Sequence, residues 1–195
     1  MTALTNAAGV TAHVPLPITR FTGGNAGQWR VTSITAVQGA TLPTAGFLDI
    51  SSTGEATGSS WHLRGTASNL RYTTADERRQ LQAKQEGLGR PASTRASLIP
   101  IRKSAVWWAM AQDERRAVYE QGSHLPIGLD YLPGVARKLY HSRDLGEDFD
   151  FLTWFEFSPD DEAAFDHMLD RLRACGEWAY VDREVDIRLA RVRKP

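Results

Sequence analysis

The feature that most constrains the fold is an order of strands and one helix that occurs twice along the chain. In the first copy, β-prone runs predict strands at 28–37 and 60–72, and a third at about 96–103. The helix between them is indicated by Thr74, a typical N-cap residue that precedes two acidic residues of a first turn. This helix is expected to end at the glycine pair in 87–89.

The second copy contains the clearest helix of the chain. Ser158 supplies an N-cap and Pro159 a favourable first helical residue. Apolar residues follow with the i, i+3, i+4, i+7 spacing of one helix face: Phe165, Met168, Leu169 and Leu172. Strands are expected at about 136–142, 148–157 and 178–192. Two β-β-α-β units in tandem predict an α+β fold of two ferredoxin-like halves, with antiparallel sheets side by side and helices outside.

Segments outside the repeat divide the chain further. Residues 1–25 are rich in Ala, Thr, Gly and Pro without periodicity, which predicts a poorly ordered arm. The first half then covers 26–104 and the second 136–195. Residues 105–135 between them predict a helical insert that Pro133 and Gly134 interrupt before the next strand.

Charge and cysteine content exclude several classes of function. The 23 basic and 23 acidic residues cancel, so no global field attracts nucleic acid or an anionic membrane, and an anionic substrate must be attracted locally. Cys175 is the only cysteine, which excludes an intramolecular disulfide and a four-cysteine metal site. The N-terminus lacks the pattern of a signal peptide, and no run reaches the roughly 18 apolar residues of a membrane span. We therefore expect a soluble, cytoplasmic protein.

Three residues could form a cofactor site. His124 and Arg137 are thirteen residues apart, and Glu177 follows forty residues later. Together they could supply a metal ligand, a fixed cation for an anionic substrate and an acceptor that orients the ligand, as a haem site for small anions requires. The turn expected at 133–134 would let a flat macrocycle meet His124 on one face and Arg137 on the other. The residues alone leave open that all three simply face solvent.

Longer segments around these residues carry a family resemblance. They are Gln85-Glu-Gly-Leu-Gly-Arg90, Leu98-Ile-Pro-Ile-Arg-Lys-Ser-Ala-Val-Trp-Trp108, Gln112-Asp-Glu-Arg-Arg-Ala117, Phe149-Asp-Phe-Leu-Thr-Trp-Phe-Glu156 and Glu184-Val-Asp-Ile-Arg-Leu-Ala-Arg191. From about Phe21 to Arg193 the chain resembles the chlorite dismutase family, specifically its short-subunit, dimeric lineage. The resemblance implies an α+β barrel, a symmetric homodimer and haem b as the cofactor.

The resemblance also implies roles on both faces of the haem. His124 would be the proximal iron ligand, and Glu177 would accept a hydrogen bond from its other ring nitrogen, which favours the oxidised states of iron. Arg137 would be the only charged group on the distal face, where its guanidinium holds an oxyanion without donating a proton. Gln85 would hydrogen-bond Arg137. The remaining distal lining would consist of Leu139, Thr153 and Phe155.

Further assignments concern the edge of the haem. The resemblance implies that Lys103 lies near the haem propionates, with Arg102 as the alternative one register step away. Trp107 and Trp108 could line the haem edge or be ordinary core aromatic residues.

The activity that the resemblance implies is the conversion of chlorite to chloride and dioxygen, through a ferryl intermediate and transient hypochlorite. The alternatives are a coproheme decarboxylase or another peroxidase-like haem protein of the same fold, and a dimeric ferredoxin-like module that binds a ligand without redox chemistry. Coproheme decarboxylases usually carry another residue at the position of Arg137 and have longer subunits. Neither nucleic acid nor a membrane is expected as a partner.

Overall fold

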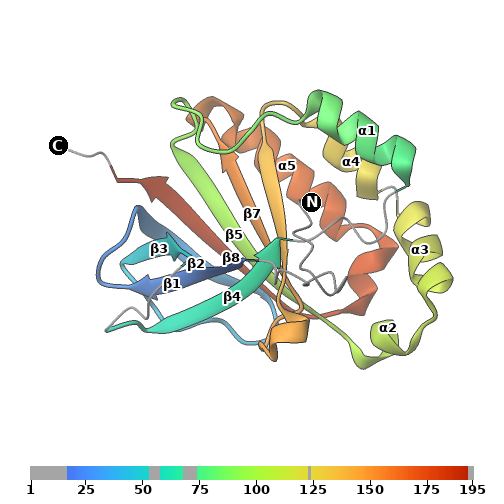
Figure 1. Cartoon of the computed structure of the whole chain (residues 1–195), viewed down its shortest axis with the longest axis horizontal. Helices are drawn as coiled ribbons and strands as arrows, with labels where there is room; N and C mark the ends of the chain where they lie inside the picture. The colour runs from blue at the N-terminus through green and yellow to red at the C-terminus, as the bar shows by residue number, and fades with distance from the viewer. Residues whose placement is uncertain (1–16, 53–57, 68–73, 123, 193–195) are drawn as a thin grey trace, which may run out of the picture.

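The computed structural model describes residues 17–52, 58–67, 74–122 and 124–192, and within these ranges eight strands form a closed antiparallel barrel (Figure 1). The strand order around the barrel is β1-β3-β2-β8-β5-β7-β6-β4, and β4 pairs back to β1. The strands are β1 (Ile18–Gly24), β2 (Trp29–Gln38), β3 (Phe47–Ser51), β4 (Trp61–Ala67), β5 (Arg95–Lys103), β6 (Ala136–His141), β7 (Phe151–Phe157) and β8 (Val181–Arg191). The expected α+β class and antiparallel barrel are confirmed.

Each half of the barrel has the strand order of a ferredoxin-like sheet. The first four strands lie in the order β4-β1-β3-β2 and the last four in the order β8-β5-β7-β6, so both follow the pattern 4-1-3-2. The predicted division into two β-β-α-β units is therefore wrong. β5 opens the second half, and the helical insert is that half's first crossover, which makes it β-α-β-β-α-β. The first half has no helix between its strands within the described residues.

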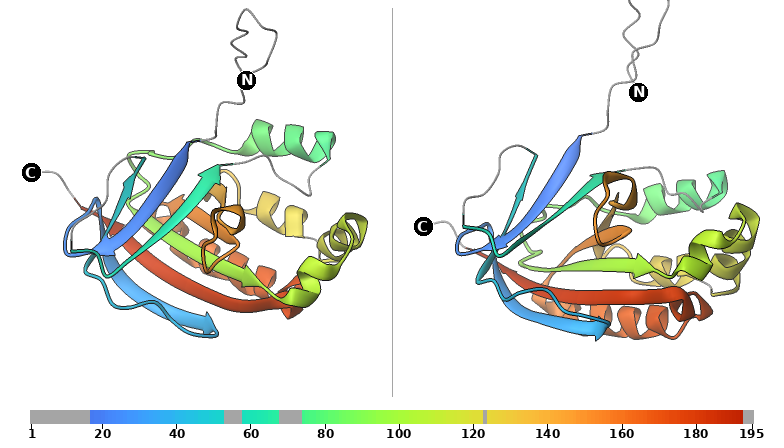
Figure 2. Two further views of the ribbon diagram at one scale, coloured as in Figure 1. Left: turned by 60° about the horizontal axis from the view of Figure 1, so that its bottom comes forward. Right: turned by 90° about the horizontal axis from the view of Figure 1, so that it is seen from below.

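The helices lie beside the second half, as Figure 2 shows. They are α1 (Ala75–Lys84), α2 (Ala105–Ala109), α3 (Gln112–Gln121), α4 (His124–Asp130) and α5 (Glu162–Arg173), with the short 3₁₀ helices η1 (Arg143–Leu145), η2 (Pro159–Asp161) and η3 (Gly176–Tyr180). Ser158 caps η2, as expected, by accepting a hydrogen bond from the Asp161 N–H at 3.2 Å. None of the described helices is both long and apolar enough to cross a membrane.

Two strands of the first half were not predicted. β1 lies within residues 1–25, where the sequence predicts a poorly ordered arm, so that expectation is wrong for Ile18–Gly24. Residues 1–16, and the expected end of the strand at 60–72, lie outside the described residues. β1 ends in two glycines because a Cβ on Gly23 would lie 2.2 Å from the ring of Trp61. A side chain there would displace that indole from the barrel interior.

Strand alternation separates two apolar cores. On β7, Leu152 and Trp154 point into the barrel, whereas Thr153 and Phe155 point outward to the helices. The outer core packs the second half against α4 and α5, where Phe165 is fully buried and stacks on the ring of Phe157 at 4.3 Å. The candidate site lies in this outer layer.

Candidate functional site

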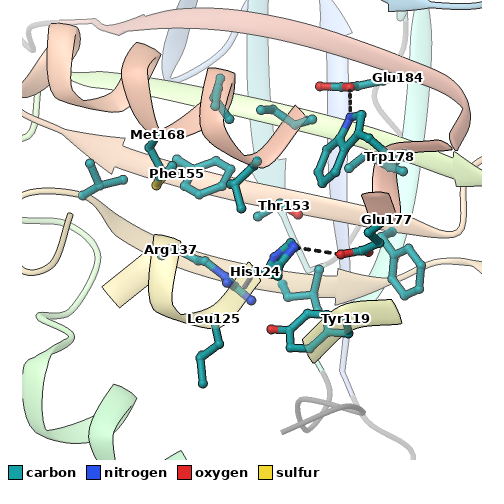
Figure 3. A pocket seen from close by; sticks show the side chains of 18 of the residues that line it. Tyr119, His124, Leu125, Arg137, Thr153, Phe155, Met168, Glu177, Trp178 and Glu184 are labelled. Atoms are coloured by element: carbon teal, nitrogen blue, oxygen red, sulfur yellow. Dashed lines mark hydrogen bonds and ion pairs between the residues drawn. The ribbon is translucent and has the colours of Figure 1, made fainter. Parts of the chain in front are cut away.

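A largely apolar cavity lies between the outer face of the second half and helices α1, α4 and α5 (Figure 3). Its apolar lining includes Leu81, Ile99, Ile101, Leu125, Leu132, Val135, Leu139, Phe155, Met168, Leu169 and Leu172. Polar side chains also reach it: Gln85, Lys103, Tyr119, His124, Arg137, His141, Thr153, Glu177 and Glu184. All three candidate residues of the sequence analysis therefore meet in one cavity.

His124 begins α4 and is paired with a buried carboxylate. Its Nδ1 lies 2.9 Å from Oε2 of Glu177 in η3, the pairing that the resemblance implied. The other oxygen of Glu177, Oε1, accepts a hydrogen bond at 2.9 Å from Nζ of Lys103 at the end of β5. Burial alone would raise the pKa of Glu177, but His124 and Lys103 outweigh it and lower this pKa to about 2. Glu177 is thus a stable anion that holds the imidazole.

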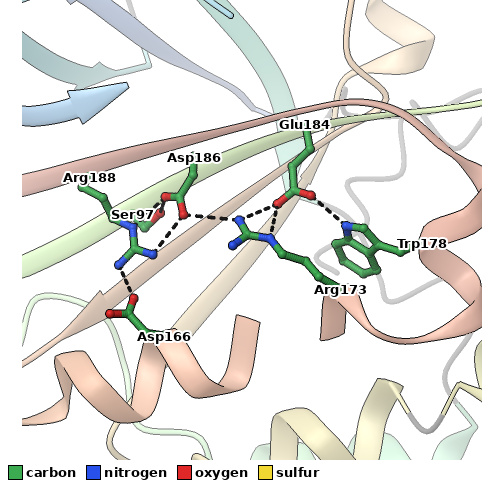
Figure 4. Close-up of polar contacts among 7 residues, drawn as sticks. All are labelled: Ser97, Asp166, Arg173, Trp178, Glu184, Asp186 and Arg188. Atoms are coloured by element: carbon green, nitrogen blue, oxygen red, sulfur yellow. Dashed lines mark hydrogen bonds and ion pairs between the residues drawn. The ribbon is translucent and has the colours of Figure 1, made fainter. Parts of the chain in front are cut away.

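Two aromatic rings enclose the imidazole of His124. Tyr119 of α3 stacks on it with ring centroids 4.7 Å apart, and Trp178 lies 6.2 Å away at an interplanar angle of 19°. The Trp178 Nε1 donates a hydrogen bond of 2.7 Å to Glu184, whose other oxygen accepts from Arg173 at 2.7 Å (Figure 4). This arrangement restricts rotation of the ring, so Nε2 is the nitrogen left available for a ligand.

Arg137 lines the same cavity as His124, and in Figure 3 its side chain extends toward His124, whose imidazole faces Glu177. It is the second residue of β6, where Phe155 of β7 is its partner in register. Leu139 and Thr153, the next pair on this face, also line the cavity. The predicted distal residues are therefore neighbours in the structure, although their contact with a cofactor stays a prediction.

Gln85 reaches Arg137 differently from the expectation. Its side-chain amide donates a hydrogen bond of 2.5 Å to the main-chain carbonyl of Arg137 and not to the guanidinium. Gln85 thus constrains the strand that carries Arg137.

Lys103 and the two tryptophans have distinct positions. The ammonium of Lys103 is bound to Glu177, an ion pair that the sequence analysis missed, and the propionate contact stays a prediction. Arg102 is exposed and does not line the cavity. Trp107 lines the cavity at 1 % exposure, with Nζ of Lys103 4.6 Å from its ring centre. Trp108 instead stacks on Phe151 and is not among the lining residues.

The residues present fit a haem. An imidazole whose Nδ1 is bound to a carboxylate offers Nε2 as an iron ligand, and the carboxylate strengthens that ligand. The surrounding apolar side chains suit a porphyrin face, and Arg137 supplies a fixed positive charge on the opposite side.

The molecule is a barrel of two ferredoxin-like sheets with an apolar cavity on its outer face. The carboxylate-bound His124 and Arg137 both line this cavity, which gives the α+β barrel a haem-type pocket. The profile of one family, described as chlorite dismutase, matches residues 43–193. The chain belongs to the chlorite dismutase family, whose members bind haem.

Solved structures and a curated relative agree with this assignment. A dimeric chlorite dismutase from Nitrobacter winogradskyi is 51 % identical, with a TM-score of 0.84 over 89 % of this chain and 99 % of that one. A mutant chlorite dismutase from Candidatus Nitrospira defluvii is 30 % identical, with a TM-score of 0.57 over 69 % of this chain and 56 % of that one. The chlorite dismutase of Ideonella dechloratans is 33 % identical over 120 residues, which cover 60 % of this chain and only 40 % of that protein.

Proposed function

We propose that this chain is a haem b enzyme that converts chlorite to chloride and dioxygen, and that it acts as a homodimer. The observation that carries the proposal is the pairing of His124 with the buried carboxylate of Glu177 in the same apolar cavity that Arg137 enters. The similar proteins from Nitrobacter winogradskyi and Ideonella dechloratans are named chlorite dismutases, and the former is described as dimeric. The reaction balances without any other reagent, because one chlorite ion contains the atoms of one chloride ion and one dioxygen molecule.

The proximal residues hold and orient the cofactor. His124 would hold the iron through Nε2, while Glu177 accepts the hydrogen bond of Nδ1 and fixes the orientation of the ring. Lys103 keeps this carboxylate in place from the other side. When bound, haem would supply a redox-active iron, which no amino-acid side chain provides.

Arg137 would bind the anions on the other side of the cavity. Its guanidinium is a planar cation with several N–H donors, so it would attract chlorite and retain hypochlorite, the ion that remains once one oxygen atom has left chlorite. Its neighbours Leu139 and Phe155 carry no titratable group, whereas His141, further along the same face of β6, also lines the cavity. The reaction as proposed needs no proton from the protein, and retention keeps both oxygen-carrying fragments close together.

An oxygen electrode tests this proposal directly. The haem-saturated protein should release dioxygen on addition of chlorite, approaching one molecule for each chlorite consumed. His124→Ala serves as the control, because it should bind haem weakly and release little oxygen. A haem-saturated wild-type protein that consumes no chlorite would overturn the proposed function.

A further inference from the structure

Residues 85–90, between α1 and β5, form a bracket against the backbone that leads to Arg137. The guanidinium of Arg90 donates hydrogen bonds to two successive main-chain carbonyls, those of Pro133 at 2.8 Å and Gly134 at 2.7 Å. Gln85, at the other end of the bracket, donates to the carbonyl of Arg137 itself. The chain is therefore held on both sides of the residue whose side chain enters the cavity.

A planar guanidinium that spans two carbonyls fixes the orientation of both peptide planes. These planes immediately precede β6, and Arg137 is the second residue of that strand. The pleat of a strand allows its side chain only two directions, so the position of the backbone decides where the guanidinium ends. A shift of the start of β6 would move the anion-binding group by a similar amount.

The bracket is itself attached to the barrel. The N–H of Gly89 donates a hydrogen bond of 2.6 Å to Oε2 of Glu156, and Arg191 of β8 binds the same oxygen at 3.3 Å. Glu156 is the register partner of Ala136, one residue before Arg137, and is 6 % exposed. Gly89 has a φ of +83°, a backbone conformation that favours glycine. The bracket thus connects the strand start to a buried carboxylate on the neighbouring strand.

We propose that Arg90 is a positioning residue for Arg137. By holding the carbonyls of Pro133 and Gly134, Arg90 places the guanidinium of Arg137 where it can bind an anion. The proposal rests on the proposed function, in which Arg137 binds the anion. Arg90 itself touches neither the cavity nor a ligand, so its effect must pass through the backbone of β6. It is an effect on binding geometry and not on the cofactor ligand His124.

Fluoride binding to the haem-loaded ferric protein, followed by absorption, tests this inference. Arg90→Met removes both carbonyl contacts and should raise the fluoride Kd about tenfold, comparable to the loss of one hydrogen bond to a charged group. Glu86→Gln is the matched control, because it removes the 2.9 Å ion pair of Arg90 and leaves the two carbonyl contacts in place. The control should bind fluoride like the wild type.

A double-mutant cycle separates positioning from general damage. In an Arg137→Ala background, Arg90→Met should have no further effect on the fluoride Kd, because the group that it positions is gone. A tenfold loss that persists in this background would overturn the proposal, as would an unchanged Kd for Arg90→Met alone. If Arg137→Ala alone leaves the fluoride Kd unchanged, the proposed role of Arg137 fails, whatever Arg90 does.

A second variant and a second measurement cover a failure to fold. Arg90→Lys retains the charge but reaches one carbonyl only, so its fluoride Kd should lie between those of wild type and Arg90→Met. In the haem-free protein, amide exchange at 135–139 should be faster in Arg90→Lys than in Glu86→Gln. Equal exchange together with a wild-type Kd in Arg90→Lys would contradict the inference.

Discussion

Glu177 accepts a hydrogen bond from His124 and another from Lys103 at a site that is 7 % exposed. Its pKa is lowered from 4.5 to about 2, so the folded protein binds this proton less tightly than the unfolded chain. The resulting stability is fully present above about pH 4.5 and is lost as the pH falls toward 2. In haem-free protein, the urea midpoint of wild type minus that of Glu177→Gln should shrink below pH 4.5. A difference that is constant with pH would contradict this account.

In the proposed function, Arg137 would retain hypochlorite and would take no part in the attachment of the cofactor. Arg137→Ala should still bind haem and still cleave the first Cl–O bond, because His124 and Glu177 are untouched. Oxygen release should fall modestly, while hypochlorite trapped by a chlorination reporter should rise and inactivation should come sooner. Arg137→Lys should restore only part of the retention, since an ammonium holds an oxyanion with less defined geometry. Wild-type oxygen yield without extra trapped hypochlorite would exclude this role.

Some contacts of the site could not be predicted because they depend on which strand face meets the helices. The resemblance was sufficient to pair His124 with Glu177, but not to place Lys103 on the same carboxylate. The contact between Trp178 and Glu184 was also missed. In the sequence, Glu184, Asp186 and Arg188 alternate on one face of a strand. Buried charges with this period could have indicated a polar contact between β8 and a helix.

At the scale of elements, periodicity and capping predicted the strands and helices with strong local signals. The helix after Ser158, the strand at 96–103 and the strands on either side of residue 145 agree with α5, β5, β6 and β7 within a few residues. β1 and β3 have weaker signals, because β1 ends in glycines that accommodate Trp61 and β3 has five residues only. Their strand character comes from pairing with distant partners, which local sequence does not encode.

Charged side chains join helix α5 to β8 through hydrogen bonds and ion pairs (Figure 4). Glu184 is fully buried, and Arg173 donates two hydrogen bonds to its Oε1, at 2.9 and 2.7 Å. Arg173→Met would leave this carboxylate without its cation, which should lower the free energy of unfolding by about 3 kcal/mol. Urea unfolding measures the loss, and adding Glu184→Gln should recover part of it.

Arg171 on the same helix is the control for that experiment. It pairs with Asp130 at 2.9 Å, but both side chains are substantially exposed, at 39 % and 58 %. Solvent screens such a pair, so Arg171→Met should leave the urea midpoint nearly unchanged. If both variants lose the same free energy of unfolding, leaving the buried Glu184 carboxylate without its cation has no measurable effect on stability.

At the scale of the whole molecule, the two halves have the same strand order but different coverage. The crossovers of the second half supply α2 to α5, α1 lies in the connection that precedes β5, and the second half carries the cavity. The sequence predicted the α+β class because each half repeats strand signals, but it placed the boundary after β5 instead of before it. Strand β5 resembles the end of one unit as much as the start of the next, and only its pairing with β7 and β8 distinguishes the two.

The difference in helix coverage between the two halves of the barrel is relevant to how two copies of the chain could form a dimer. The first half lacks crossover helices in the described residues, and the Nitrobacter winogradskyi protein that matches 89 % of this chain is described as dimeric. Light scattering should therefore give a mass of twice 21.6 kDa, and a mass of any other number of subunits would contradict the proposed homodimer. A reducing agent should not change this mass, because Cys175 is the only cysteine and its thiol donates to the Gly122 carbonyl at 2.8 Å. Burial also raises the pKa of this thiol, which keeps it protonated and slow to oxidise. A mass that falls to one subunit on reduction would instead assign the dimer to a disulfide between two copies of Cys175.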